Sequence, residues 1–437
     1  MIEQSTIYAL SSGQGRAGVA VIRVSGLQSS EVLKRLIGEL PKPRFASLRN
    51  LRAGAEYIDQ ALVLWLPGPS TVTGEDMAEF HVHGSPAVIV KLFAELAKIE
   101  NVVAAEAGDF TRRAFENARI DLVEVEGLAD LLSSQTESQR RLAMRQFMGE
   151  ASAVYESWRS QLTAALAVLE AAIDFVEEDD VVQDAWNHVK PNVEKLRGEL
   201  LHAVELSTKA GAVRDGLKLV IAGPPNAGKS SLMNWLVGRE AAIVSPIAGT
   251  TRDVVERAID FHGVRLLVSD TAGIRGDVSD GIEAVGIDRA KTEVRDADIL
   301  VWVTAPDVLT GVGPERSADV EVHNKSDLVS SRIRNDDSIA VSVKYGQGLS
   351  QLTEVLKNLI QVRSSVANNA IVVRHRHVAA VKETIRLLND SLEDEKRPLE
   401  LIAEDLRKAT RAISSITGRI DVEDLLGKIF SEFCIGK

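Results

Sequence analysis

The stretch LKLVIAGPPNAGKSSLMNWL, from Leu217 to Leu236, decides the fold of the central part of the chain. It contains an apolar run, then a glycine-bounded turn, then a helix-forming segment. Residues 223–230 match the phosphate-binding pattern G-x-x-x-x-G-K-[ST] without a mismatch. Gly223 and Gly228 let the backbone approach phosphate oxygens, and the N–H groups that follow form an anion cradle where a helix starts. The alternative is a glycine-rich turn that opens a helix by chance, and the strand-loop-helix context disfavours it.

Further signals for a nucleotide site follow this loop in chain order. Residues 249–253 (GTTRD) form a loop before a strand-like stretch. A threonine of that loop, Thr251, can complete the Mg²⁺ shell to which the Ser230 hydroxyl contributes. Asp270, at the end of the apolar run LLVSD, is expected to contact Mg²⁺ through water. Gly273 is expected to direct its backbone N–H at the γ-phosphate.

The base-recognition signals are NKSD at 324–327 and SVK at 342–344. The Asp327 carboxylate can pair with both the guanine N1–H and the 2-amino group. Adenine lacks that donor pair and leaves a charge unpaired, so the sequence predicts GTP rather than ATP. Five signals in this order favour a GTPase domain over a coincidental α/β nucleotide fold. The predicted GTP-binding residues are Asn226, Ala227, Gly228, Lys229, Ser230, Ser231, Ser245, Pro246, Ile247, Ala248, Gly249, Thr250, Thr251, Asp270, Thr271, Ala272, Gly273, Asn324, Lys325, Asp327, Ser342, Val343 and Lys344.

The predicted hydrolytic machinery differs from that of Ras-type enzymes, in which a glutamine orients the attacking water. The residue that follows the DTAG sequence is Ile274, and an isoleucine cannot orient water. The chemistry must therefore be organised by other groups. Lys229 can reach the β- and γ-phosphates and is a candidate catalytic residue. The amide oxygen of Asn226 can bind a monovalent cation against the phosphates.

Length and composition limit the number of domains and the possible partners of the chain. A chain of 437 residues is long enough for about two to four domains. A net charge of −12 argues against a broad basic surface, so a nucleic acid partner requires a local patch or a second protein. The single cysteine, Cys434, excludes an intramolecular disulfide framework and suits a reducing cytosol. The sequence has neither a long apolar run nor a leader pattern, so we expect a cytoplasmic protein without a membrane span.

Residues 1–118 mix short strands with helices, an order that indicates a compact α+β domain. The strands are predicted from β-branched runs bounded by Gly or Pro, and the helices from apolar residues spaced three to four apart. The predicted strands are 18–24, 61–66 and 78–82, and the predicted helices are 30–40 and 88–99.

From residue 119 the pattern becomes helical, with an apolar stripe that continues through 146–176. Pro191 marks a second long helix, which reaches about Ser207. The P-loop region interrupts this helical material, which resumes after it, and such insertions are tolerated where chain ends lie close together. We therefore predict a multidomain α/β chain. Its parts are an N-terminal domain (1–118), a discontinuous helical domain (119–214 and 366–437) and an inserted Ras-like GTPase domain with a parallel sheet (215–365).

The sequence closely resembles the MnmE (TrmE) family of tRNA modification GTPases over essentially its whole length. The C-terminal Cys-x-Gly-Lys beside a split helical domain is specific to that family. The matching stretches are GPPNAGKSS (223–231), SPIAGTTRD (245–253), DTAGI (270–274), FCIGK (433–437), IYALSSGQGRAGVAVIRVSG (7–26), TGEDMAEFHVHGSP (73–86) and GDFTRRAFENARIDL (108–122).

The resemblance implies a homodimer whose N-terminal domains pair and bind 5-formyl- or 5,10-methylene-tetrahydrofolate. It also implies a flavoprotein partner, MnmG (GidA), which supplies FAD and holds most of the tRNA substrate. Together they are expected to install an aminomethyl-type group, carboxymethylaminomethyl or related, on carbon 5 of the wobble uridine of certain tRNAs. The GTPase domains are expected to swing together when K⁺ and GTP are bound.

By motif match, the resemblance implies that Asn226 is a K⁺ ligand. The backbone carbonyls of Ser245 and Ile247 and the Thr250 position would complete the shell. The cation would lie where an arginine finger otherwise neutralises developing charge. Glu283 aligns with the family glutamate that positions or polarises the attacking water, and it is assigned as catalytic. The alternative for Glu283 is a solvated acid at the start of a helix.

The resemblance assigns the folate site to Arg23, Glu79, Arg119 and Lys437. An arginine can pair with the glutamate tail of a folate, and Glu79 can accept hydrogen bonds from the pterin. Taken alone, each of these residues is more often a surface charge. The sequence departs from the family pattern twice, because Arg119 stands where many relatives have lysine and Ser85 replaces the second glycine of His-Gly-Gly.

Several further features have more than one interpretation. Cys434, near the folate by family position, is either a participant in the modification chemistry or an inert, partly buried thiol. His81 and His83 lie on one face of a strand, but no third metal ligand is evident. Residues 374–377 (RHRH) are predicted as a solvated loop rather than an RNA contact. Two other functions remain open: a ribosome-assembly GTPase without a folate site, and a nucleotide-gated scaffold outside the modification reaction.

Overall fold

The chain forms two compact units. The N-terminal unit comprises residues 1–129 and 414–437, and the second unit comprises residues 130–413. Within the described ranges, no helix is both long enough and apolar enough to cross a membrane. The computed structural model describes residues 5–174, 179–239, 241–242, 257–270, 291–308, 313–328, 338–367, 370–393, 397–420, 423–431, 433 and 435–436.

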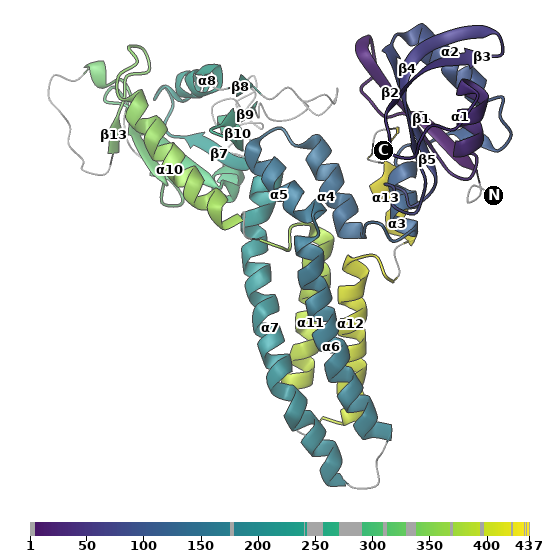
Figure 1. Ribbon diagram of the computed structural model, residues 1–437. Helices are drawn as coiled ribbons and strands as arrows, with labels where there is room; N and C mark the ends of the chain where they lie inside the picture. The colour runs from purple at the N-terminus through teal and green to yellow at the C-terminus, as the bar shows by residue number, and fades with distance from the viewer. Residues whose placement is uncertain are drawn as a thin grey trace, which may run out of the picture. The chain divides into compact units, whose positions relative to one another are not determined.

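A six-stranded sheet in the order β3-β4-β5-β2-β1-β6 forms the centre of the N-terminal unit (Figure 1). Its neighbouring strands run antiparallel, except for the parallel pair of β1 and β6. The strands are β1 (Thr6–Leu10), β2 (Ala17–Ser25), β3 (Ser47–Ala53), β4 (Glu56–Leu66), β5 (Met77–Gly84) and β6 (Val102–Ala104), and the helices are α1 (Ser29–Ile37), α2 (Pro86–Leu96), α3 (Asp109–Glu116) and α4 (Leu122–Ser133).

The two faces of this sheet differ because strand side chains alternate in direction. On β2, Ile22 and Val24 are fully buried in the apolar cluster that also includes residues of α1 and α2. Arg23 and Ser25 therefore point to the opposite face, where Phe110 of α3 is buried. The predicted strands at 18–24, 61–66 and 78–82 and the predicted helices at 30–40 and 88–99 are confirmed as β2, β4, β5, α1 and α2.

The C-terminal residues are part of the N-terminal unit. The helix α13 (Glu423–Ser431) carries Phe430, which is fully buried in a cluster with Val125 of α4. Ile435 forms an antiparallel bridge with Ala107, and Ser11 Oγ donates a hydrogen bond of 2.9 Å to the Gly436 carbonyl. The sequence places this segment with the helical domain, and the three-part division at 118, 214 and 365 stays a prediction.

Long helices make up much of the second unit, and α7 is the longest of those described. Pro191 lies inside α7, so the helix extends well beyond both ends of the predicted one. The predicted loop at 374–377 is wrong, because α11 begins at His375 and His377 is fully buried against Tyr155. The helices are α5 (Glu137–Phe147), α6 (Glu150–Asp174), α7 (Asp179–Asp215), α10 (Leu349–Ala367), α11 (His375–Glu393) and α12 (Leu399–Ile416).

A seven-stranded sheet in the order β13-β12-β11-β7-β10-β9-β8 completes the second unit. The predicted parallel sheet is confirmed for the five strands from β13 to β10, whereas β9 and β8 are antiparallel additions at one edge. Its elements are β7 (Leu217–Ala222), α8 (Lys229–Arg239), β8 (Ala241–Ala242), β9 (Arg257–Phe261), β10 (Val264–Asp270), β11 (Ile299–Thr304), β12 (Val320–His323), the short 3₁₀ helix η2 (Ser326–Leu328) and β13 (Ser338–Ala340).

The contact between Gly108 and α13 predicts a stability effect within the N-terminal unit. Gly108 has a φ of 76°, and a Cβ built on it would lie 2.5 Å from the Phe430 carbonyl oxygen. Gly108→Ala is expected to destabilise the unit by about 1–3 kcal/mol, because α13 must move away. Hydrogen exchange of α3 and β1 amides in increasing urea measures this change. Gly13→Ala, a position with no atom within 4 Å of its built Cβ, is the control, and equal effects would contradict the prediction.

Candidate functional site

The P-loop follows β7 at the carboxyl edge of the parallel strands, and its backbone is closely enclosed. Gly223 has a φ of 148°, and a Cβ built there would lie 2.0 Å from the Val303 carbonyl oxygen on β11. Gly228 has a φ of 89°, and its Cβ would lie 2.1 Å from Nδ2 of Asn324. No real Cβ tolerates such distances, so the loop can pass here only with glycine at both positions.

The first residues of α8 connect this loop to the end of β10. The Lys229 Nζ donates a hydrogen bond of 2.9 Å to the Pro224 carbonyl, so the ammonium group lies over the P-loop. Ser230 Oγ donates to Asp270 Oδ2 at 2.5 Å. A hydroxyl and a carboxylate in contact are the oxygen ligands, direct or through water, that Mg²⁺ prefers beside nucleotide phosphates. These residues therefore fit the predicted magnesium site.

Asn324 joins the P-loop to the base-recognition loop. It is 4% exposed, and its Nδ2 donates a hydrogen bond of 2.9 Å to the Ala227 carbonyl. Its Oδ1 accepts a hydrogen bond of 3.3 Å from the Val343 N–H. One buried amide thus fixes two loops that follow different strands.

The base-recognition residues lie beside this amide. Asp327 is exposed, and its Oδ1 accepts a hydrogen bond of 2.5 Å from Ser342 Oγ, which orients the carboxylate. Lys325 has a φ of 57°, and its Nζ forms an ion pair of 2.6 Å with Asp307. The hydrogen bond from Lys325 lowers the pKa of Asp307 below its ordinary value. Lys344 lies over the Tyr345 ring, 5.1 Å from its centroid.

Residues 226–231, Asp270, 324–327 and 342–344 meet at one edge because they follow parallel strands of one sheet. Ligands of open parallel sheets bind at this carboxyl edge. A phosphate cradle and a carboxylate that matches guanine define a P-loop protein of the guanine nucleotide-binding class.

Comparison with known proteins identifies the family. The family models named "GTP-binding protein TrmE N-terminus" and "MnmE helical domain" match residues 6–119 and 122–434. The tRNA modification GTPase MnmE of Rhizobium etli (strain CIAT 652) is 44% identical over 99% of both chains. That of Rhizobium meliloti (strain 1021) is 44% identical over 100% of both chains. The chain therefore belongs to the MnmE family of tRNA modification GTPases.

A more distant likeness involves a solved structure. It is a GTP-binding protein of Sulfolobus solfataricus in complex with GDP, which aligns with 62% of this chain and 85% of its own. The identity is 13% and the TM-score is 0.24, which is too low to support an argument.

A second candidate site lies in the N-terminal unit, at the predicted folate residues. Arg23 and Glu79 stand directly opposite each other on β2 and β5, and both Nε and Nη2 lie 3.0 Å from Oε1 of Glu79. The guanidinium carbon lies 5.9 Å from the centroid of the Phe110 ring. Glu79 Oε2 lies 3.4 Å from Nε2 of His81. The arginine is thus oriented by a carboxylate and an aromatic face.

Arg119 follows α3 and is exposed. Its aliphatic stem lies against the loop before β5, because a Cβ built on Gly74 would be 3.3 Å from Cγ of Arg119. His83 Nδ1 lies 2.8 Å from Asp59 Oδ1, so the two predicted strand histidines contact different carboxylates. Among the described residues, no group of three His, Cys, Asp or Glu side chains is placed to bind a metal ion.

Several predicted site residues belong to parts of the chain that the structure does not describe, so their roles stay predictions. They include the switch loop, the predicted water-positioning acid and two C-terminal residues. They are Ser245, Pro246, Ile247, Ala248, Gly249, Thr250, Thr251, Thr271, Ala272, Gly273, Glu283, Cys434 and Lys437.

Some functional contacts were missed from the sequence. The NKSD pattern predicts Asn324 as a nucleotide contact but does not show its bond to the Ala227 carbonyl. The ion pair of Glu75 with Arg113 was also missed, although the two residues lie in stretches that match the family, 73–86 and 108–122. Residues 38 positions apart give no local pattern, and only the packing of α3 against the loop before β5 brings them together.

The Asn324 contacts predict a nucleotide-affinity effect. Asn324→Ala leaves the Ala227 carbonyl and the Val343 N–H without this partner, so both loops lose their common support. The affinity for GDP is expected to fall about tenfold, corresponding to roughly 1–2 kcal/mol. Titration with a fluorescent GDP analogue measures it. Asn234→Ala on the exposed side of α8 is the matched control, and an unchanged Asn324→Ala affinity would refute the argument.

Proposed function

We propose that this chain is a K⁺-activated GTPase that acts with the flavoprotein MnmG (GidA) on tRNA. Together they install an aminomethyl-type group, carboxymethylaminomethyl or related, on carbon 5 of the wobble uridine, using a tetrahydrofolate one-carbon donor. The observation that carries the proposal is the meeting of the P-loop, Asp270 and residues 324–327 at one sheet edge in a chain of the MnmE family.

The proposed assembly is a cytoplasmic homodimer with its flavoprotein partner, which supplies FAD. The chain carries a net charge of −12, so it is poorly suited to hold a polyanion over a broad surface. We therefore assign most of the contact with tRNA to the partner.

In the proposed nucleotide site, the side chains have separate roles. Lys229 binds the β- and γ-phosphates when its ammonium group exchanges the Pro224 carbonyl for phosphate oxygens. Ser230 and Thr251 hold Mg²⁺, with Asp270 acting through water, and the ion neutralises charge between the phosphates. Asp327 accepts the guanine N1–H and 2-amino hydrogens and so excludes ATP.

Hydrolysis requires groups that replace the missing glutamine at Ile274. Asn226 is exposed and has a φ of 62°, which supports access of its amide oxygen to a cation beside the phosphates. Ser245, Ile247 and Thr250 are proposed to complete that K⁺ site. Bound K⁺ would supply positive charge where an arginine finger acts in other GTPases. Glu283 is then the proposed residue that positions the attacking water.

The N-terminal unit is proposed to bind the one-carbon donor, 5-formyl- or 5,10-methylene-tetrahydrofolate. Support comes from the Arg23–Glu79 pair, which offers guanidinium donors and carboxylate acceptors side by side. Glu79 can accept hydrogen bonds from the pterin donors, and an arginine elsewhere in the site, such as Arg119, can pair with the carboxylate tail at the opposite end of the folate. Arg119 and Lys437 add positive charge, and Cys434 is the proposed thiol near the transferred carbon.

The proposed cation site predicts that GTP turnover depends on K⁺. Replacing K⁺ by Na⁺ at equal ionic strength is expected to slow hydrolysis at least about tenfold, because a charge-stabilising group is lost. Phosphate release under saturating GTP measures the rate. Asn226→Ala is expected to abolish the difference between the two ions, whereas Asn234→Ala is expected to keep it. Equal turnover in the two salts would exclude the cation mechanism.

The tRNA reaction itself predicts a chemical change in cells. Mass spectrometry of wobble uridines from a deletion strain is expected to show loss of the aminomethyl-type modification. Normal modification together with association with ribosomal subunits would favour a ribosome-assembly GTPase. Reconstituted modification that proceeds without this chain would favour a nucleotide-gated scaffold. Either of these results would overturn the proposal.

A further inference from the structure

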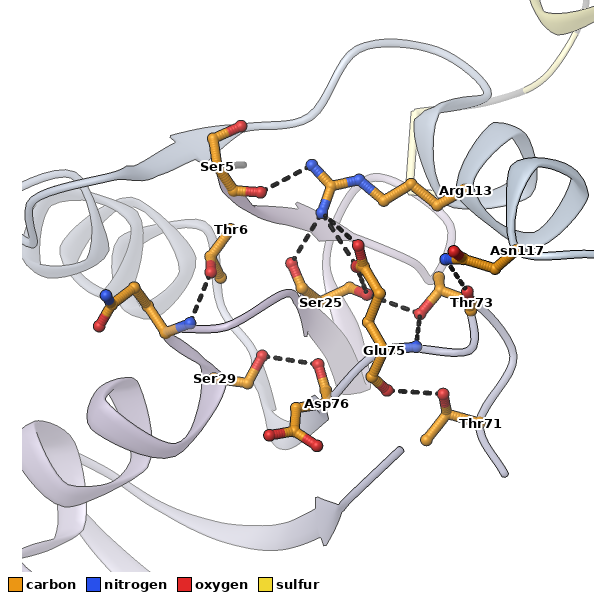
Figure 2. Close-up of polar contacts among 11 residues, drawn as sticks. Ser5, Thr6, Ser25, Ser29, Thr71, Thr73, Glu75, Asp76, Arg113 and Asn117 are labelled. Atoms are coloured by element: carbon orange, nitrogen blue, oxygen red, sulfur yellow. Dashed lines mark hydrogen bonds and ion pairs between the residues drawn. The ribbon is translucent and has the colours of Figure 1, made fainter. Parts of the chain in front are cut away.

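A partly buried ion pair joins α3 to the loop that leads into β5 (Figure 2). Arg113 Nη1 lies 3.2 and 2.9 Å from the two carboxylate oxygens of Glu75, and Nη2 donates a hydrogen bond of 2.7 Å to the Ser5 carbonyl. Arg113 is 8% exposed. The Glu75 carboxylate also accepts a hydrogen bond of 2.7 Å from Ser25 Oγ. Ser25 in turn shares a hydrogen bond of 2.7 Å with Thr73, and both side chains are fully buried.

One end of this network reaches the Arg23–Glu79 pair. Arg23 and Ser25 project from the same face of β2 because they are two residues apart on a strand. On α3, Phe110 and Arg113 are three residues apart and therefore share a helix face. Phe110 contacts the Arg23 guanidinium, while Arg113 contacts the Ser25 carbonyl at 3.4 Å. Helix α3 therefore holds Arg23 through Phe110, and it holds the end of β2 through Arg113.

The other end reaches Arg119. Asn117, just after α3, donates a hydrogen bond of 2.7 Å from Nδ2 to the Thr73 carbonyl. The next residue of the loop, Gly74, lies against the Arg119 stem. Thr71 Oγ1 donates a hydrogen bond of 2.6 Å to the Glu75 carbonyl. The loop is therefore held by a hydrogen bond between its own residues as well as by its contacts with α3. A shift of this loop would therefore move the surface on which Arg119 rests.

We infer that the Glu75–Arg113 pair positions the folate site, by fixing the 71–76 loop and α3 so that Arg23 and Arg119 keep one relative placement. The inference rests on the proposed folate function of these arginines. A partly buried ion pair contributes little net stability, and the better-supported role of such a pair is to specify one arrangement. Neither Glu75 nor Arg113 is assigned to contact the ligand, so both are positioning residues.

The test measures 5-formyltetrahydrofolate affinity and GTP hydrolysis in the same full-length proteins. Glu75→Gln removes the charge of the carboxylate, and Asn117→Ala removes only the loop contact of an exposed side chain. Each is expected to weaken folate binding about tenfold, because the arginines lose their fixed placement. GTP hydrolysis, which belongs to the second unit, is expected to stay unchanged. Arg113→Lys, which keeps the charge but not the two-way fork, is expected to recover part of the affinity lost in Arg113→Ala.

Matched controls separate positioning from general loss of stability. Glu95→Gln alters a buried carboxylate of α2 that pairs with Lys91 and Lys98, and Asn50→Ala removes an exposed amide that accepts a hydrogen bond from Gln60. Both are expected to bind folate as the unaltered protein does. If they lose as much affinity as Glu75→Gln, the positioning role is wrong.

A double-mutant cycle with Arg119→Ala measures whether the loss of folate affinity in Glu75→Gln depends on Arg119. A purely structural role of Glu75 would give the same loss with and without Arg119. If the network acts partly through Arg119, Glu75→Gln is expected to cost about threefold or less in the Arg119→Ala background, against about tenfold alone. Equal costs in the two backgrounds, or unchanged affinity in Glu75→Gln and Asn117→Ala, would overturn the inference while the folate function stands. An unaltered protein that shows no saturable binding would instead refute the folate function, and the inference with it.

Discussion

Steric clearance of the main chain is the constraint on which the nucleotide site depends. The P-loop passes so close to β11 and to Asn324 that neither Gly223 nor Gly228 can carry a side chain. This closeness has a chemical purpose, because a phosphate cradle is built from backbone N–H groups that must face the ligand. Since Asn324 also binds the Val343 N–H, the same packing sets the distance between the phosphate and base ends of the site.

The parts of the fold that follow from local chemistry could be predicted from the sequence. A P-loop needs glycine, lysine and serine at fixed spacing, and a guanine pocket needs a carboxylate after a strand. The structure places Lys229, Ser230 and Asp327 at the carboxyl edge of one sheet, as those patterns require. Three strands of the N-terminal unit, β2, β4 and β5, were also predictable, because their β-branched runs are bounded by Gly or Pro.

The parts that depend on long-range packing could not be predicted. Pro191 normally interrupts a helix, yet α7 continues through it, with Val193 and Val189 buried on either side. Tertiary burial of a long apolar stripe outweighs a local propensity of about 3 kcal/mol. Likewise, a run of four charged or imidazole side chains, as at 374–377, is typical of a solvated loop. His377 is nevertheless buried, because Tyr155, 222 residues away, contacts its ring and the Ile371 carbonyl.

The two candidate sites differ in what positions their ligand-binding groups. In the P-loop those groups are largely main-chain N–H groups, which are placed by strand pairing, by the absence of Cβ atoms and by the Asn324 amide. Arg23 and Arg119 would bind through long, flexible side chains, whose rotamer freedom costs up to about 2 kcal/mol each to restrict. Restricting them requires further side chains, and Phe110, Glu79 and the stem contact at Gly74 supply that restraint. A side-chain site therefore needs a more extensive supporting polar network, of the kind in Figure 2, than the Asn324 amide contacts that hold the P-loop.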